Sequence, residues 1–396
     1  LINLFVIKGL AINLTKYYLL ITGDFCPIYR NASKVENLDL TVFGELLPII
    51  QQSSFAITNL EAPITSSNEK ISKIGPNIKT GRNAATLLKQ ANFKLVTTAN
   101  NHILDYGEEG IKDTFSILNE LDIFHTGAGK NLVEAEQPFI FEQDKMKIGI
   151  LNFAENEFNS AGHSSYGSNP VNPISNHYSI KELKRRVDFV IVIAHGGREH
   201  YQLPTPKLRE RYRFYIDSGA DLVVGHHTHC VSGYEQWNGK YIFYSLGNFV
   251  FDYKKHYRKG IWTIGMALQL NFSKSEFHFR LIPFEQGKEE DPTLKLMQAN
   301  QLETFHEEME ELNKIIINDS SFFNAWKKQI RKERIGYMAD IVIQNRYVRA
   351  AMSRGIIPFL HFHNKKHLLL LSNLFRCETH NEIATSILND LSKLGK

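Results

Sequence analysis

The sequence predicts an α/β fold that is followed by a helical C-terminal extension. Six apolar or β-branched runs read as strands, and segments of helical periodicity lie between them. The predicted strands are residues 16–22, 55–58, 94–98, 187–194, 221–224 and 241–244. Because sites in such sheets form beyond the carboxyl ends of the strands, we expect the residues that follow these runs to meet.

Each predicted strand leads into polar side chains that can bind metal or transfer protons. In chain order they are Asp24; Asn59 and Glu61; Asn101 and His102; His195; His226, His227 and His229; Ser245 and Asn248. The strongest stretch is 222–229, where a β-branched run ends in glycine and three imidazoles fall within four residues. A single histidine more often belongs to the core or to a solvated surface. The recurrence of polar strand ends favours a divalent-metal site instead.

Two helical segments and a hairpin complete the predicted fold. Residues 107–121 carry apolar side chains at i, i+4, i+7 and i+10, and residues 208–216 form a second segment that ends near Gly219. Residues 260–284 alternate like a closing antiparallel hairpin. Beyond it the chain becomes charged and helix-prone, with the boundary near 286–294. The expected organisation is an uncertain N-terminal extension (1–15), a main domain (16–286) and a helical accessory region (287–396).

Composition narrows the class of protein. The 396 residues are 43% hydrophobic and 22% charged, which is enough to bury a full core. The net charge of +4 is too small and too scattered to predict a nucleic-acid partner. Three cysteines cannot build a disulfide framework and favour a reducing compartment. The apolar N-terminus is too short to span a bilayer, so we expect a soluble, cytoplasmic protein without a transmembrane segment, and the initial Leu1 indicates an alternative start or a fragment.

The predicted donors have a composition that suits transition metals. Asp24 and Glu61 offer anionic oxygens, Asn101 offers an amide oxygen, and the histidines offer imidazole nitrogens. Mixed oxygen and nitrogen donors in this number suit two divalent ions such as Mn²⁺, Zn²⁺ or Fe. Two such ions roughly 3.5–4 Å apart can clamp the attacking and leaving oxygens of a phosphoryl displacement.

Seven motifs, in order, resemble the CapA-type poly-γ-glutamate capsule biosynthesis proteins, a branch of the calcineurin-like metallophosphoesterases. They are Gly23-Asp24, Asn59-Leu-Glu61-Ala-Pro, Ala99-Asn-Asn-His102-Ile-Leu-Asp105-Tyr-Gly107, Gly127-Ala-Gly129, His195-Gly-Gly-Arg-Glu199, Gly225-His-His-Thr-His229 and Tyr244-Ser-Leu-Gly-Asn-Phe249-Val-Phe-Asp252. The resemblance covers roughly residues 17–284. It implies a metallophosphoesterase-like αββα sandwich of two mixed sheets, with the helical extension outside it.

The resemblance also implies roles for individual residues. Asp24 and His229 would bind the first metal, and Glu61 would bridge both ions where the superfamily usually has an aspartate. The second metal would be bound by Asn101, His195 and His227. His102 would be a catalytic acid or electrostatic donor near the leaving group. The choice of His227 over His226 rests on a His-x-His match, and an offset of one would exchange them.

Each of four further residues has two alternative interpretations. Cys26 stands where the superfamily usually has a metal-binding histidine, and is either a thiolate ligand or a buried apolar side chain. Glu199 either acts directly in catalysis or anchors its loop. Asp105 either orients His102 or caps the helix that begins near Gly107. Arg82 either holds an anionic substrate or is a solvated surface residue.

These patterns predict a metal-dependent hydrolase of phosphoesterase type that acts in capsule or other surface-polymer biosynthesis. Two alternatives stay open: a non-catalytic metal-binding scaffold subunit of a polymer synthase-export complex, and a metal-dependent γ-glutamyl amide hydrolase. The expected partners are an anionic substrate or polymer and other capsule biosynthesis proteins. The aromatic and basic C-terminal region, including 322–326 and 361–367, is either a helical cap with a charged face or a docking surface for such a partner.

Overall fold

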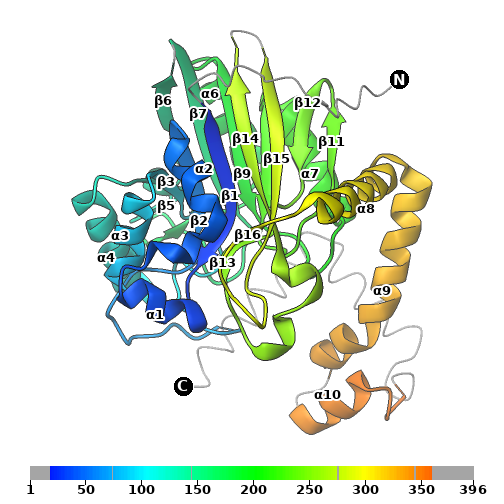
Figure 1. The fold of residues 1–396 in the computed structure, drawn as a ribbon. Helices are drawn as coiled ribbons and strands as arrows, with labels where there is room; N and C mark the ends of the chain where they lie inside the picture. The colour runs from blue at the N-terminus through cyan, green and yellow to red at the C-terminus, as the bar shows by residue number, and fades with distance from the viewer. Residues whose placement is uncertain (1–17, 74, 144, 274–275, 343–344, 359–396) are drawn as a thin grey trace. The chain divides into compact units, whose positions relative to one another are not determined.

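A computed structural model describes residues 18–73, 75–143, 145–273, 276–342 and 345–358 (Figure 1). The chain divides into two compact units, Leu1–Phe322 and Phe323–Lys396. The expected basic segment 361–367 lies outside the described residues. No helix in the described ranges is long and apolar enough to cross a membrane.

The first unit is built on two mixed sheets. The first sheet has the strand order β16-β15-β14-β1-β2-β3-β4, with β13 also paired to β1. Its strands are β1 (Leu19–Cys26), β2 (Phe55–Leu60), β3 (Phe93–Thr97), β4 (Phe124–Thr126), β13 (Asn248–Phe251), β14 (Ile264–Phe272), β15 (Phe277–Glu285) and β16 (Lys295–Leu296). The parallel strands β13, β1, β2, β3 and β4 therefore end at one edge, where the predicted site residues lie.

The second sheet has the order β11-β12-β10-β9-β7-β6. Its strands are β6 (Phe139–Gln143), β7 (Met146–Ala154), β9 (Phe189–His195), β10 (Leu222–His226), β11 (Tyr234–Trp237) and β12 (Lys240–Phe243). A two-stranded ribbon pairs β5 (Ala128–Gly129) with β8 (Gly167–Ser168). Five of the six predicted strands coincide closely with strands of these sheets; the first, 16–22, corresponds to β1, which is shifted toward Cys26.

Side-chain alternation places the two sheets face to face with helices outside them. In β1, Leu19 and Ile21 pack with Ile191 of β9 in a core between the sheets, whereas Leu20 packs with helical side chains on the other face. That outer face is covered by α1 (Arg30–Glu36), α2 (Leu47–Gln52), α3 (Arg82–Gln90) and α4 (Gly107–Glu120). The second sheet is covered by α6 (Pro173–Lys184) and α7 (Pro206–Asp217). The expected αββα sandwich is confirmed, and α4 and α7 match the predicted helices.

The remaining α-helices of the described residues belong to the C-terminal part of the chain, apart from the short α5 (Leu132–Ala135). They are α8 (Ala299–Ile317), α9 (Asp319–Val342) and α10 (Arg346–Ser353). The first unit extends past the expected boundary at residue 286, because β16 pairs with β15 and Phe305 and Met309 of α8 complete the core between the sheets. A composition change thus precedes the end of the compact unit by some 36 positions (322 − 286).

Parallel registers bring the polar strand ends together. Asp24 of β1 lies beside Asn59 of β2 and beside Asn248 of β13. In the second sheet, His226 of β10 pairs with His195 of β9. The glycine before Asp24 has a packing reason: a Cβ on Gly23 would lie 1.9 Å from the carbonyl oxygen of Gly247.

Candidate metal centre

Two buried carboxylates occupy the centre of the predicted site. Asp24 and Glu61 are both fully buried. Asn59 donates from Nδ2 to Oδ1 of Asp24 at 2.7 Å, but among the described residues neither oxygen of Glu61 has a hydrogen-bond donor. Burial, together with the charges of Asp24 and Glu199, raises the pKa of Glu61 well above its usual value. A buried carboxylate without a donor is costly, and a bound cation would compensate it.

Imidazoles surround these carboxylates. His195 ends β9, with Nε2 3.8 Å from a Glu61 oxygen and Nδ1 3.9 Å from an Asp24 oxygen. His229 places Nε2 3.6 Å from Glu61 and Nδ1 3.7 Å from Asp24. His227 Nδ1 lies 3.1 Å from His195 Nε2. Side chains at such separations leave room for ions between them rather than forming direct hydrogen bonds with the carboxylates.

The turn after β10 holds its histidines in a strained backbone. His227 and His229 have φ angles of 89° and 53°, a region that residues with side chains rarely adopt. The His227 amide donates to Oδ2 of Asp24 at 3.1 Å. Asn248 Oδ1 lies 2.9 Å from Nδ1 of His229, which leaves Nε2 to face Glu61. The surrounding strands thus fix a conformation that presents these imidazoles to the carboxylates.

Among the described residues there are three groups of side chains, and within each group all the donor atoms lie within 4.8 Å of one another. The groups are Asp24, Glu61 and His229; Glu61, His195 and His227; and Glu199, His227 and His229. Glu61 is shared by the first two, which is the arrangement of a bridging carboxylate. Asn101 joins the second group, because its Oδ1 lies 3.0 Å from His195 Nε2. The structure therefore brings together all six residues that the sequence predicts as metal ligands.

Burial keeps the imidazoles in the form that binds metal. Burial, and then the neighbouring imidazoles, place the pKa of His195 well below its usual value. Burial and the His229 imidazole lower the pKa of His227 to about 4. Both side chains are therefore neutral near pH 7, with nitrogen lone pairs available for a divalent cation. This donor set fits a divalent metal. The strongest indication is the Glu61 carboxylate, which has no hydrogen-bond donor among the described residues.

His102 stands beside this centre in a network of its own. Its Nδ1 lies 2.7 Å from Oδ2 of Asp105, which also accepts the Ile78 amide at 2.7 Å. The helix-cap reading of Asp105 is wrong, because Tyr106 occupies the N-cap of α4 and no side chain caps it. Asp105 instead holds the imidazole, so Nε2 is the nitrogen left to meet a substrate. Burial lowers the pKa of His102, while the Asp105 hydrogen bond acts in the opposite direction.

Two supporting residues were missed by the sequence analysis. The Lys73 side chain is 2% exposed and forms an ion pair with Asp105; it also donates to the main-chain oxygen of Asn101 at 3.1 Å. Glu157 hydrogen-bonds to the side chain of Asn101, whose Oδ1 lies 3.0 Å from Nε2 of His195. Neither lies in a strand-end motif, and an isolated lysine or glutamate in a polar loop gives no sequence signal.

Two of the less certain residues lie outside the donor groups of the described chain. Cys26 packs in an apolar cluster with Ala62, Phe251 and Trp262. Burial and the charges of Glu61 and Asp24 raise the pKa of Cys26 well above the usual value in the metal-free protein. His226 is buried at the end of β10 and is absent from the groups that contain His227. The geometry favours His227 at this position.

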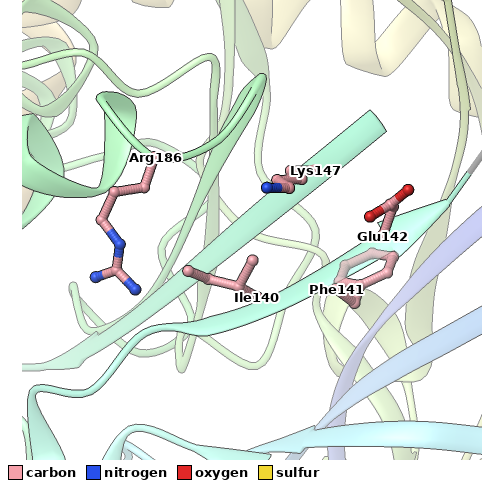
Figure 2. Close-up of a pocket in the computed structure, with 5 residues that line it drawn as sticks. All are labelled: Ile140, Phe141, Glu142, Lys147 and Arg186. Carbon is pink, nitrogen blue, oxygen red and sulfur yellow. The ribbon is translucent and has the colours of Figure 1, made fainter. Parts of the chain in front are cut away.

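Two other features remain to be placed: Arg82 and a surface hollow. Arg82 is exposed and paired with Glu120 at 2.6 Å, which agrees with a solvated surface residue. A hollow of about 490 Å³ lies on β6 and β7, with Lys147, Arg186 and Glu142 around it (Figure 2). None of the predicted site residues lines this hollow.

Comparison with known proteins identifies the family. A family model described as "Bacterial capsule synthesis protein PGA_cap" matches residues 19–253, which is more than half of the chain. The chain belongs to this family. The resemblance to CapA-type proteins that the ordered motifs predict is therefore confirmed, and the matched stretch contains every residue of the candidate metal centre.

Curated relatives carry related names. The chain is 34% identical over 216 residues to the PGA biosynthesis protein CapA of Bacillus subtilis, covering 54% of this chain and 57% of that protein. It is 31% identical over 220 residues to the capsule biosynthesis protein CapA of Bacillus anthracis, covering 53% and 54%. A Mycobacterium tuberculosis relative, 26% identical over 228 residues (54% and 60%), is a probable polyglutamine synthesis accessory protein. The chain thus spans about half the length of the curated relatives it matches.

Solved structures give weaker likenesses. A hypothetical protein of Thermus thermophilus has a TM-score of 0.43 at 14% identity, covering 68% of this chain and 99% of that one. A putative 5'-nucleotidase of Staphylococcus aureus has a TM-score of 0.42 at 13% identity, covering 74% and 58%. Scores of this size carry no argument about activity.

Proposed function

We propose that this member of the PGA_cap family is a metal-dependent hydrolase of phosphoesterase type that acts in capsule or surface-polymer biosynthesis. The observation that carries the proposal is the Glu61 carboxylate, which is buried, lacks a hydrogen-bond donor within the described chain and is shared by two donor groups. Two divalent ions, of the Mn²⁺, Zn²⁺ or Fe class, would satisfy it. When bound, they would polarise the scissile group and activate a water.

The protein's own residues would bind, orient and exchange protons. Asp24 and His229 would hold one ion, Asn101, His195 and His227 the other, and Glu61 both. His102 would face the leaving oxygen with Nε2, because Asp105 occupies Nδ1. The contact from Lys73 to Asp105 would keep that imidazole in place. A phosphoester, or a γ-glutamyl amide, of an anionic substrate would be cleaved between these groups.

An accessory role is the alternative of a different class. It is supported by the Mycobacterium tuberculosis relative, whose name describes an accessory protein. A scaffold would need the metal for folding or binding. It would have no use for His102, an imidazole that is not a metal ligand but could transfer a proton. The buried His102–Asp105–Lys73 network at the rim of the centre favours an enzyme.

Metal analysis combined with hydrolysis assays separates these functions. The purified protein is analysed for bound metal, then tested with Mn²⁺ on phosphomonoesters, phosphodiesters and γ-glutamyl amides. We expect Asp24→Ala and His229→Ala to lose metal, and His102→Ala to keep metal and lose turnover. A protein that binds no divalent ion contradicts the metal centre. A protein that binds ions and cleaves none of these substrates supports the accessory role.

A further inference from the structure

Glu199 lies in a turn that is fastened to the histidine turn. The chain leaves β9 through Gly196 and Gly197, whose φ of 111° suits glycine. The Gly197 amide donates to the Glu155 carboxylate at 3.1 Å. One residue after Glu199, the His200 amide donates to the main-chain oxygen of Thr228 at 2.8 Å. Because both flanks are bound, the backbone of Glu199 is held above His227 and His229.

The carboxylate of Glu199 lies within reach of the same ions as these histidines. A Glu199 oxygen, His227 and His229 form one of the three groups whose donor atoms lie within 4.8 Å. The Glu199 side chain is still 43% exposed, so a substrate or water could also meet it.

Two other side chains near these histidines are engaged elsewhere. Cys26, the alternative ligand in the sequence, has a thiol that packs against Ala62 and Trp262. The nearby Glu155 is not free to serve, because Arg211 binds it at 2.8 Å.

We propose that Glu199 is a metal ligand, which joins His227 and His229 in binding an ion on the side of the centre where these three side chains meet. This inference rests on the proposed metal centre and deepens it: an ion beside His227 and His229 would also be bound by a carboxylate from the turn after β9. Glu199 then contacts the ion rather than transferring a proton to the substrate.

Metal-binding titrations test this assignment without reference to turnover. The full chain is freed of metal with a chelator and titrated with Mn²⁺ by calorimetry and electron paramagnetic resonance. We expect two equivalents for the unaltered protein. In Glu199→Gln we expect one of them to bind about tenfold more weakly or worse, because a charged ligand is removed. Glu199→Asp should recover part of the loss. Glu210→Gln, an exposed glutamate on α7, is the matched control.

Cobalt spectra test the competing ligand. We expect Co²⁺-loaded protein to lack the near-ultraviolet thiolate-to-cobalt charge-transfer band, and Cys26→Ser to bind two ions as the unaltered protein does. Equal binding of both ions by Glu199→Gln and the unaltered protein would overturn the assignment while the proposed metal centre stands. A charge-transfer band that Cys26→Ser abolishes would also overturn it. If two ions bind and no substrate is cleaved, the proposed hydrolase fails while the Glu199 titration still decides this inference. If the unaltered protein binds no metal, both proposals fail.

Discussion

Replacing Glu61 by glutamine should stabilise the metal-free protein and weaken its metal binding. Glu61 is buried without a hydrogen-bond donor in the described structure, and burial together with Asp24 and Glu199 raises its pKa well above 4.5. Without metal, the folded state therefore keeps a proton that the unfolded chain loses as the pH rises through 4.5. Glutamine has the same size and no proton to lose, so Glu61→Gln escapes this cost.

The sign and the size follow from proton linkage. Stability changes with pH in proportion to the protons bound by the unfolded state minus those bound by the folded state. For Glu61 this difference is negative above pH 4.5, so the metal-free protein loses stability as the pH rises, until the folded carboxyl itself ionises. The slope is about 1.4 kcal/mol per pH unit over the range in which the folded carboxyl keeps its proton.

Histidines act in the opposite direction, and a difference between variants removes their effect. Burial lowers the pKa of His195 and His227, so their contribution is present above their ordinary pKa near 6.5 and is lost as the pH falls below it. Since Glu61→Gln retains both histidines, subtracting the two stability curves isolates the carboxyl. The difference should be smallest near pH 4.5 and grow in favour of the variant toward pH 8.

Urea unfolding of chelator-treated protein across pH 4.5–8 measures this difference, with Glu210→Gln as the control that should match the unaltered protein. Saturating Mn²⁺ should reverse the order of stability, because an ion at 100 times its Kd adds about 2.7 kcal/mol to a protein that binds it. Parallel curves for the metal-free variant and the unaltered protein would refute the reasoning, since Glu61 would then ionise in the folded state as it does in the unfolded chain.

Three further outcomes are expected. The Lys73→Met variant should keep its metal but lower turnover about 10–100-fold, because Asp105, which holds His102, loses its ion pair with Lys73. Lys73→Arg should recover part of the rate. An unchanged kcat in Lys73→Met would contradict the positioning role. Gly225→Ala would place a Cβ 2.1 Å from the main-chain oxygen of Tyr244. It should lower the free energy of unfolding, measured in urea, by about 3 kcal/mol. A loss below about 1 kcal/mol would show that the backbone at Tyr244 moves to make room. A chain ended after residue 322 should unfold cooperatively on heating, whereas one ended after residue 286 should not. The shorter chain loses Phe305 and Met309 from the core between the sheets, and each such side chain contributes about 1.5–3 kcal/mol to stability. Equal melting curves for the two chains would contradict this expectation.

The strand ends were predictable because they combine two independent regularities. β-Branched runs identify buried strands, and parallel strands bring their carboxyl ends to one edge. Asp24, Glu61, Asn101, His195, His227 and His229 follow such runs, so their proximity was expected without any distance. Lys73 obeys neither regularity: it lies in an irregular loop and reaches Asp105 across 32 positions. Contacts of this kind depend on the path of a loop, which periodicity does not describe.

The domain boundary shows a different limit of composition. The chain becomes charged and helix-prone beyond residue 286, which describes its solvent face. The compact unit ends at Phe322 because the other face of α8 is apolar and packs into the core between the sheets. Composition averages the two faces of an amphipathic helix, so it reports the change in surface and misses the packing.

Cys26 shows how one backbone irregularity decides a ligand set. In a regular strand, residues 24 and 26 would point to the same face, and a thiol two residues after Asp24 would be a natural second ligand. The pairing of β1 with β13 shifts register between Asp24 and Phe25, and such a bulge re-aims the side chains that follow it. Cys26 accordingly packs against apolar side chains while Asp24 faces the histidines. An Asp-x-Cys motif alone cannot reveal that shift, so the sequence leaves Cys26 a candidate ligand although the structure turns its thiol toward apolar side chains.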